Sequence, residues 1–335
     1  MRFSPPKNVL RGDWLAAGPY GGNEVVLQEE TNPQMEGMIH LSGNEVRAGR
    51  LRPTSITQLS DELGITVRIQ GPFMGGERIQ EIRLYNQIRR IDFRSELKGF
   101  PGHDGMMTVV FPLPRRGNPQ TAHETHNAVT LRPDGIYAAH TWVDVGDSKS
   151  GTALINRGTG GYEIEGATAR LIWLRSITQH GLYQAPEASE AGNPVIEYAL
   201  YPHSGHWSES AVVEAAHSFN SPLRALATDA HEGTLPEEHS FLSIDLGGFE
   251  VTALKKADQG EEFILRGHEM RGTASRVGVQ IRLPVERAFW ADLLERSEKE
   301  LEVQDGRIEF DCQPFQFVTL RLQMKSRSAA GAFHH

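Results

Sequence analysis

At 335 residues, the chain exceeds the usual size of one hydrophobic core, which predicts two domains. Its 34 lysines and arginines against 43 acidic residues give a net charge of −9 with no basic block, which argues against nucleic-acid binding and against an anionic membrane surface. A neutral polar ligand fits this balance better.

The cysteine count and the N-terminal segment bear on the compartment. Cys312 is the one cysteine, so an intrachain disulfide is impossible and a reducing compartment is favoured. The start, MRFSPPKNVLRGDW, lacks the apolar run of a signal peptide, and no stretch approaches the roughly 18 apolar residues of a membrane span. We therefore expect a cytoplasmic protein that contacts no membrane.

Alternation of apolar and polar residues predicts β-strands along most of the chain, so the expected fold class is all-β. Around Ile88, Ile91 and Phe93, for example, the pattern gives one buried and one wet face, as in antiparallel sheets. In chain order, strands are expected within residues 64–71, 80–97, 106–114, 151–158, 162–166, 169–177, 195–202, 249–257, 261–269, 275–283, 306–313 and 315–324.

Few segments favour helices. Ser208–Phe219 has apolar residues at helical spacing after Ser208, a plausible N-cap, and FWADLLERSEKEL, residues 289–301, suits either a short helix or a strand. The glycine-rich GTGGY, residues 158–162, lacks the Lys-Ser/Thr ending of a phosphate loop and is interpreted as a hairpin.

The expected domain organisation follows from composition. Residues 225–238, ALATDAHEGTLPEE, are rich in turn-forming and acidic residues and are the best linker candidate. We expect a large domain over 1–230, with residues 1–30 as a partial connecting segment, then a smaller domain over 239–324. Residues 325–335 are expected to form a disordered tail.

Histidines and carboxylates are candidates for a metal or catalytic site. HETH places His123 and His126 three residues apart, but no His-x-His, His-x-Asp or HExxH pattern occurs, so loop histidines bonded to the backbone are the favoured interpretation. Four acids could serve in glycoside hydrolysis, yet each also suits a turn or a strand end. They are Asp134, Asp144, Asp147 and Glu269.

The segment YPHSGHW is the best candidate for a carbohydrate contact. It places His203 and His206 between Tyr201 and Trp207, just after a predicted strand. Aromatic rings offer stacking faces for the C–H patches of sugar rings, and histidines can bond hydroxyls. Polar loop histidines at a strand end are the competing interpretation.

Four blocks, in order, resemble the C-terminal region of family 38 glycoside hydrolases, the α-mannosidases. They are EIRLYNQIRRIDFRSEL with MMTVVFPLP, then HTWVDVGDSKSGTALINRGTGGYEIEGATARLIWLRS, then EYALYPHSGHW with AHSFNSPL, and finally VTALKKADQGEEFILRGHEMRGTA continuing to IEFDCQPFQFVTLRL. The resemblance covers residues 60–323, with Gln316 where the family usually has glutamate. It implies a galactose-mutarotase-like supersandwich followed by a smaller β-sandwich.

The resemblance also implies which parts are missing. The family carries its zinc ligands and aspartate nucleophile in an N-terminal α/β domain marked by His-x-Asp, with a further zinc-ligand histidine on the helical domain that follows. GHDGMMT, residues 102–108, echoes that second motif only superficially, because it lacks the first histidine and the Gly-Thr ending. No catalytic residue and no metal ligand is therefore carried over, and zinc is expected in the complete family enzyme, not here.

Three functional hypotheses follow. The first is a C-terminal β-region of an α-mannosidase-like enzyme that supports mannoside binding and hydrolysis together with the catalytic domain, in cis or in trans, and is inactive alone. The second is a free-standing carbohydrate-binding module, which needs Trp207 and Tyr201 on an open groove. The third is an aldose-epimerase-like enzyme, which needs a histidine and a carboxylate together in a pocket. The proposed sugar contacts are His203, His206, Trp207 and Tyr201, with Trp142 behind them.

Overall fold

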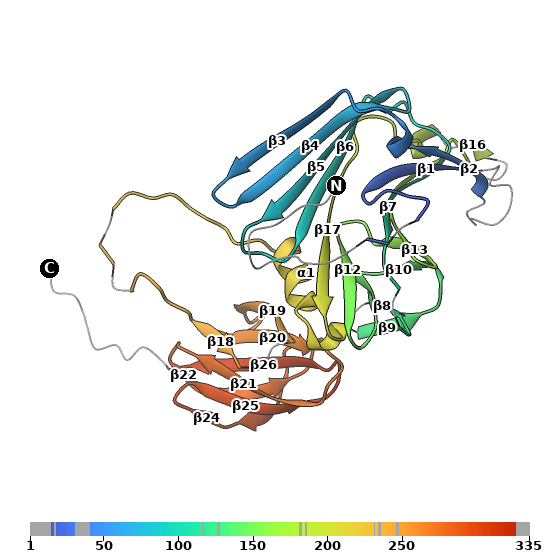
Figure 1. Cartoon of the computed structure of the whole chain (residues 1–335). Coiled ribbons are helices and arrows are strands. Elements are labelled where there is room, and N and C mark those ends of the chain that lie inside the picture. The colour runs from blue at the N-terminus through green and yellow to red at the C-terminus, as the bar shows by residue number, and fades with distance from the viewer. Residues whose placement is uncertain are drawn as a thin grey trace. The chain divides into compact units, whose positions relative to one another are not determined.

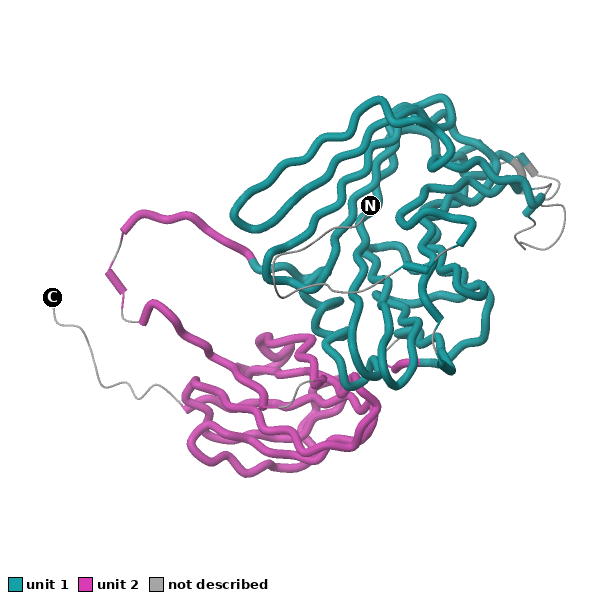
Figure 2. Tube along the Cα trace, viewed as in Figure 1, with its two compact units in different colours: residues 1–126, 130–223 teal, residues 127–129, 224–335 magenta. Residues whose placement is uncertain are grey.

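A computed structural model describes residues 15–16, 18–30, 41–115, 117–125, 128–180, 183–184, 186–230, 232–233, 236–245 and 248–325. The chain is nearly all β, which confirms the predicted fold class. It divides into two compact units, residues 1–126 with 130–223 and residues 127–129 with 224–335 (Figure 2). Each unit has a hydrophobic core of its own.

The first unit contains two large antiparallel sheets (Figure 1). The six-stranded sheet has the order β10 (Gly135–Ala138), β13 (Gly161–Glu165), β14 (Thr168–Ser176), β7 (Gly105–Pro112), β1 (Glu24–Glu30), β2 (Leu41–Arg47). The nine-stranded sheet has the order β3 (Ser55–Asp61), β4 (Gly64–Phe73), β5 (Gly76–Tyr85), β6 (Ile91–Lys98), β17 (Val195–Ser204), β12 (Ser150–Arg157), β11 (Trp142–Gly146), β8 (Gln120–Thr125), β9 (Ala128–Arg132). A short pair, β15 (Gln179–His180) and β16 (Tyr183–Gln184), stands apart from both.

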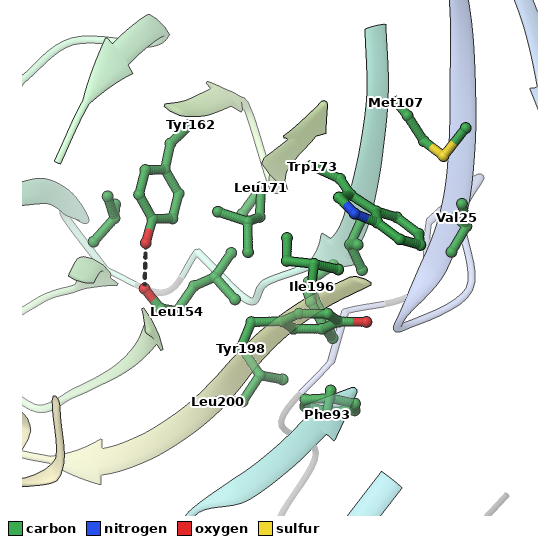
Figure 3. Close-up of a cluster of buried hydrophobic side chains, with 14 of the residues drawn as sticks. Val25, Phe93, Met107, Leu154, Tyr162, Leu171, Trp173, Ile196, Tyr198 and Leu200 are labelled. Atoms are coloured by element: carbon green, nitrogen blue, oxygen red, sulfur yellow. Dashed lines mark hydrogen bonds between the residues drawn. The ribbon is translucent and has the colours of Figure 1, made fainter. Parts of the chain in front are cut away.

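The core of the first unit lies between these sheets (Figure 3). Phe93 and Tyr198 of the nine-stranded sheet stack at 5.3 Å, and Phe111 of the six-stranded sheet meets Phe93 edge-on at 5.4 Å. The buried Tyr162 hydroxyl donates a hydrogen bond to the Leu154 carbonyl across the core at 3.2 Å. The two inner faces therefore interdigitate as in other β-sandwiches, and side chains of the opposite alternation point outward.

The N-terminal segment departs from the expectation of a connecting piece. β1 lies between β7 and β2 and pairs with both. Val25, Val26 and Leu27 are fully buried there. The run EVVLQEE is buried on both faces, so it lacks the alternation used to identify strands, and residues 24–30 are a core strand of the large unit.

The glycine-rich segment after β12 is not the predicted hairpin. β12 belongs to the nine-stranded sheet and β13 to the six-stranded sheet, so residues 158–160 carry the chain from one sheet to the other. Gly158 has φ +81°, a conformation that favours glycine. A side chain at Gly160 would lie 2.6 Å from the carbonyl oxygen of Ala139, which explains a second glycine in this crossing.

The predicted helix near Ser208 forms later than expected. Trp207–Glu209 make a 3₁₀ turn, η3, and the helix α1 spans Val212–Asn220. Ser208 does not cap α1, because its hydroxyl bonds the His206 ring at 2.8 Å. α1 buries Val213, Ala216 and Phe219 and packs on the outward face of β12 and β17. The other 3₁₀ turns are η1 (Ala48–Arg50) and η2 (Pro186–Ala188).

β3 is the outermost strand of the nine-stranded sheet. The β3–β4 hairpin exposes three large apolar side chains over more than half of their surface: Ile56 (55%), Leu59 (67%) and Leu63 (68%). The seven residues of β3, SITQLSD, contain no lysine and no proline.

The second unit is a smaller pair of antiparallel sheets with its core between them. One sheet has the order β18 (Leu242–Ile244), β21 (Ser275–Ile281), β25 (Arg307–Cys312), β24 (Val303–Gln304); the other has β19 (Phe249–Lys256), β20 (Phe263–Glu269), β26 (Phe317–Met324), β22 (Val285–Ala291), β23 (Ser297–Leu301). The ambiguous segment 289–301 is thus strand, turn and strand. The predicted tail lies, except for Lys325, outside the described residues.

Within the described part of the chain, no helix is long and apolar enough to cross a membrane.

Candidate functional site

The segment YPHSGHW runs from the end of β17 through a glycine turn into η3. Strand alternation places Tyr201 and His203 on the outward face of the nine-stranded sheet, where their rings stack at 6.3 Å. Gly205 has φ +76°, which lets the chain turn sharply before His206. Tyr201 and His206 are half-buried, whereas His203 is buried.

Asp144 of β11 is the partner of His203. The imidazole Nε2 lies 2.8 Å from Asp144 Oδ1, and Nδ1 lies 3.1 Å from the Gly205 carbonyl oxygen. The carbonyl and the ionised carboxylate both accept, so the charged imidazolium, with a proton on each ring nitrogen, satisfies both contacts. Burial opposes this charge, but the hydrogen bond and the charge of Asp144 outweigh it and raise the pKa of His203.

A glycine between the two strands makes this ion pair possible. β12 separates β11 from β17, and its Gly151 stands opposite His203. A side-chain carbon at Gly151 would lie 2.7 Å from the His203 Nε2 and 3.0 Å from the Asp144 Oδ1. The His203 side chain therefore extends across β12 to Asp144. The two residues lie 59 positions apart, so their spacing in the sequence does not predict the pair.

The two tryptophans of the predicted sugar site are buried. Trp142 is 1% exposed and Trp207 is 7% exposed, and their rings meet at 5.5 Å with a 46° tilt. The His206 ring lies 5.3 Å from Trp207 and completes the cluster. Trp207 therefore does not lie on an open groove, which was the condition for a stacking platform at this segment. Tyr201 and His206 keep partial exposure.

The other candidate acids have structural partners. Glu269 accepts backbone N–H bonds from Arg271, Gly272 and Phe315, which fixes a loop. Asp147 accepts from the backbone of Lys149 and Ser150 at a turn. Asp134 accepts from the backbone of Gly166 at 2.7 Å and from Arg115. His140 lies 3.5 Å from Glu124, but its ring is largely exposed.

The histidine–carboxylate condition for an epimerase-like site is met only in part. Asp144 and His203 are together, but each side chain is 3% exposed, so neither can reach a substrate. The remaining candidates are scattered. His126 lies outside the described residues, and Asp104 beside His103 is bonded to Thr178.

A zinc site does not fit the residues present. No group of three or more histidine, cysteine, aspartate or glutamate side chains that could hold a metal occurs within the described ranges. Cys312 is buried, and burial raises the pKa of its thiol to about 11.

A groove of about 420 Å³ lies on the outward face of the first unit, away from YPHSGHW. Its lining comes from β4, β5 and β6, from Arg157 and Glu197 on β12 and β17, and from α1 and the residues that follow it. We call it the arginine groove. Its lining residues are Thr66, Glu81, Arg83, Tyr85, Arg90, Asp92, Phe93, Arg94, Arg157, Glu197, Ser218, Phe219 and Pro222. None of the five predicted sugar-contact residues belongs to it.

The arginines of the arginine groove form ion pairs, two of them along β6 and the residue before it and one between β12 and β17. Arg90 bonds both carboxylate oxygens of Asp92, at 2.6 and 3.0 Å. Arg94 bonds Glu96 at 2.8 Å, and Arg157 bonds Glu197. Burial, and then the hydrogen bond to Asp92, raise the pKa of Tyr85 to about 12, so its hydroxyl stays protonated.

The sequence contains one signal for this groove, the alternation that predicts a solvent-exposed strand face. Within the strand-rich segment 80–97, the alternate positions 81, 83 and 85 of one strand and 92, 94 and 96 of the next are charged or carry a hydroxyl group. That alternation shows which face points outward. It does not show that α1 packs on the same face and forms a wall, which depends on a helix more than 100 residues further along the chain.

The fold defines a class: an all-β region of one large and one small sandwich whose described residues offer no metal cluster. Two family models match it in order. The model of the glycosyl hydrolases family 38 C-terminal domain covers residues 42–182, and that of the family 38 C-terminal beta sandwich domain covers residues 248–320. The chain therefore belongs to the C-terminal region of family 38 glycoside hydrolases, as the resemblance predicted.

Curated relatives support the same assignment. Alpha-mannosidase 2C1 of Homo sapiens is 31% identical over 262 residues, which is 73% of this chain and 24% of the relative. Alpha-mannosidase 2C1 of Mus musculus is 29% identical over 264 residues, 74% of this chain and 24% of the relative. The chain thus spans about a quarter of the length of these proteins.

Solved structures show the same fold. A family 38 protein from Enterococcus faecalis superimposes with a TM-score of 0.76 at 17% identity, over 90% of this chain and 40% of that one. An alpha-mannosidase from Enterococcus faecalis V583 gives 0.76 at 16% identity, over 90% and 38%.

Proposed function

We propose that this chain is the β-region that supports the catalytic half of an α-mannosidase-like enzyme, on the same polypeptide or a separate one. The observation that carries the proposal is the ordered match of two family 38 C-terminal models to two successive parts of a chain that spans 24% of its relatives. The substrates of the complete assembly would be mannosides. The chain itself would contribute packing and substrate positioning and not the reacting groups.

Exposed apolar side chains on the first unit support the proposal that a partner covers part of its surface. Ile56, Leu59 and Leu63 each expose more than half of their surface on one hairpin, and a partner that covers this hairpin would remove apolar surface from water. A catalytic half would cover some of this area. The lone, buried Cys312 supports a reducing compartment, so we place the function in the cytoplasm.

The buried His203–Asp144 pair has a supporting role in this proposal. It ties the end of β17 to β11 and holds the turn at Gly205 that leads into η3 and α1. Tyr201 and His206, which keep partial exposure, remain the proposed sugar contacts of the segment. Trp142 and Trp207 would shape that surface from beneath.

The test is hydrolysis of an aryl α-mannoside by the purified chain, with added zinc and in parallel with chelator. We expect no turnover in either condition. The chain is then mixed with a family 38 catalytic half made without its own β-region, and we expect association and a gain of turnover. Chelator-sensitive turnover by the chain alone would contradict the proposal, as would a catalytic half that is fully active and does not bind the chain.

A matched variant sharpens this test. Leu59→Glu with Leu63→Glu places charge on the exposed hairpin without touching the core, so folding should be unchanged. We expect the variant to lose association with the catalytic half. Leu226→Glu, at a position that is 90% exposed in the segment between the two units, is the control and should associate normally.

A further inference from the structure

We infer that the arginine groove is a binding site for a neutral polyhydroxyl ligand of the size of a mono- or disaccharide. The groove lies within the first unit, and a volume of about 420 Å³ is in the range of small-molecule sites. This inference rests on the proposed function in one respect only, the choice of mannosides as the first probes.

The balance of charge in the groove selects the ligand class. Four arginines and three carboxylates line it, so neither sign dominates. An anionic ligand would approach Glu81 and Glu197, and a cationic one would approach Arg83 and Arg94. A neutral ligand meets neither repulsion.

The hydrogen-bonding chemistry of the groove suits hydroxyl groups. A guanidinium has five N–H donors and a carboxylate only accepts, so a paired arginine and acid present donors beside acceptors. A sugar hydroxyl both donates and accepts, and two adjacent hydroxyls can bridge such a pair. Within the groove, Arg157 with Glu197 offers this arrangement, and Arg94 adds further donors; both arginine side chains keep more than a third of their surface exposed.

The lining is held in place before any ligand arrives. Arg90 bonds Asp92 twice, and it also donates to the Ser218 hydroxyl at 2.9 Å and to the Ala215 carbonyl of α1 at 3.2 Å. Arg157 donates to the Phe219 carbonyl, and its guanidinium carbon lies 4.3 Å from the Phe219 ring centroid. These contacts tie the floor of the groove to its wall. Side chains that are already fixed lose little conformational entropy when a ligand binds.

The groove also offers apolar surface. The Tyr85 ring and Pro222 lie among the charged residues, and Tyr85 is held by a 2.7 Å bond from its hydroxyl to Asp92. Sugar rings present C–H patches beside their hydroxyls, and an aromatic ring with a fixed polar tip suits both. This combination of paired charge and aromatic surface is what the buried Trp207 of YPHSGHW and its neighbour Trp142 do not provide.

The experiment is titration calorimetry of the full chain with methyl α-mannoside and with an α-linked mannobiose, and with inorganic phosphate as the anionic probe. We expect the sugars to bind and phosphate not to compete. Glu197→Gln and Arg94→Gln each remove a charge and keep hydrogen-bonding atoms, and each should weaken sugar binding about tenfold. Glu300→Gln, which changes the exposed pair with Arg287 in the second unit, is the matched control and should bind as the wild type does.

Three results would overturn the inference: no heat with either sugar at millimolar concentration, phosphate competing with the sugar, or unchanged affinity in both groove variants. Each leaves the proposed supporting role standing, because association with a catalytic half is measured without sugar. Conversely, if the chain binds the sugars but does not associate with a catalytic half, the proposed sugar site stands and the supporting role is rejected.

Discussion

His203 and His123 are both buried histidines, yet their surroundings move their pKa values in opposite directions. Burial opposes the charge of His203, but its hydrogen bond to Asp144 and the charge of Asp144 outweigh burial and raise its pKa. His123 packs edge-on between Tyr137 and Tyr162, and burial lowers its pKa to about 4. Opposite shifts give opposite dependences of folding stability on pH.

For His203, stability should fall as the pH rises. Its folded-state pKa lies above the unfolded value of 6.5, so the stabilisation is complete below that value and is lost as the pH rises through the folded-state pKa. Asp144→Asn should remove this slope and lower the free energy of unfolding of the first unit at pH 6 by about 3 kcal/mol, since it leaves a buried charge without its partner. Urea unfolding at several pH values measures both effects.

Asp311→Asn is the control for that variant, because Asp311, like Asp144, is a strand aspartate paired with a cationic side chain, here Arg276, but its side chain is 76% exposed. Its effect should stay below about 1 kcal/mol at every pH. A pH slope above 6.5 that survives in Asp144→Asn would show that another group, and not His203, titrates there.

For His123, stability should fall as the pH is lowered. The folded state resists protonation down to about pH 4, whereas the unfolded chain binds the proton near 6.5, so acidification favours unfolding between these values. The loss should be on the order of 2 to 3 kcal/mol between pH 7 and pH 4. His123→Phe should flatten this part of the curve while leaving the slope above pH 6.5 intact; an unchanged acid slope would reject the assignment.

At the scale of the element, α1 both packs on the nine-stranded sheet and forms a wall of the arginine groove. Phe219 is 4% exposed, and its ring lies beneath the guanidinium groups of Arg90 and Arg157 at 5.1 and 4.3 Å. Stability and groove shape therefore depend on the same side chain.

Phe219→Ala should lower the free energy of unfolding of the first unit by about 3 to 4 kcal/mol and weaken sugar binding, because it opens a cavity beneath both arginines. Chemical denaturation and calorimetry measure the two effects. Leu223→Ala, at a position that is fully exposed, is the control and should change neither. A stable Phe219→Ala with native affinity would show that α1 is not held through this ring.

Strands were predictable where one face is wet, as in β5 and β6, because alternation follows directly from the pleat. β1 was missed because EVVLQEE is buried on both faces. Segment 289–301 was ambiguous because its turn, residues 292–296, is fixed by Asp292 accepting from the backbone of Leu294 and Arg296, which is a local bond that apolar spacing does not reveal.

The candidate site was less predictable than the strands. Exposure of Trp207 could not be inferred, because its partner Trp142 lies 65 positions earlier and meets it only in the folded sheet. The ion pair of His203 with Asp144 depends likewise on the register of three strands. The expectation of a neutral polar ligand, drawn from the absence of a basic block, agrees with the ligand class proposed for the arginine groove and stays a prediction.

At the scale of the whole molecule, the two units have separate cores and are joined by an exposed segment around Leu226. Two cooperative units predict two thermal transitions. Leu154→Ala, in the first core, and Val279→Ala, in the second, should each lower the midpoint of one transition only. Differential scanning calorimetry of the two variants distinguishes this from a single cooperative unit, in which both substitutions would shift the same peak.

Among the described residues, β3 leaves one edge of the nine-stranded sheet without a neighbouring strand, and we expect this edge to limit how concentrated the protein can be made. Natural sheets commonly place lysine or proline on such edges to prevent added strands, and SITQLSD has neither. Without a covering partner, we expect reversible aggregation that grows with concentration despite the net charge of −9. Gln58→Lys should raise the concentration at which light scattering begins. If that concentration is unchanged, the chains aggregate through another surface.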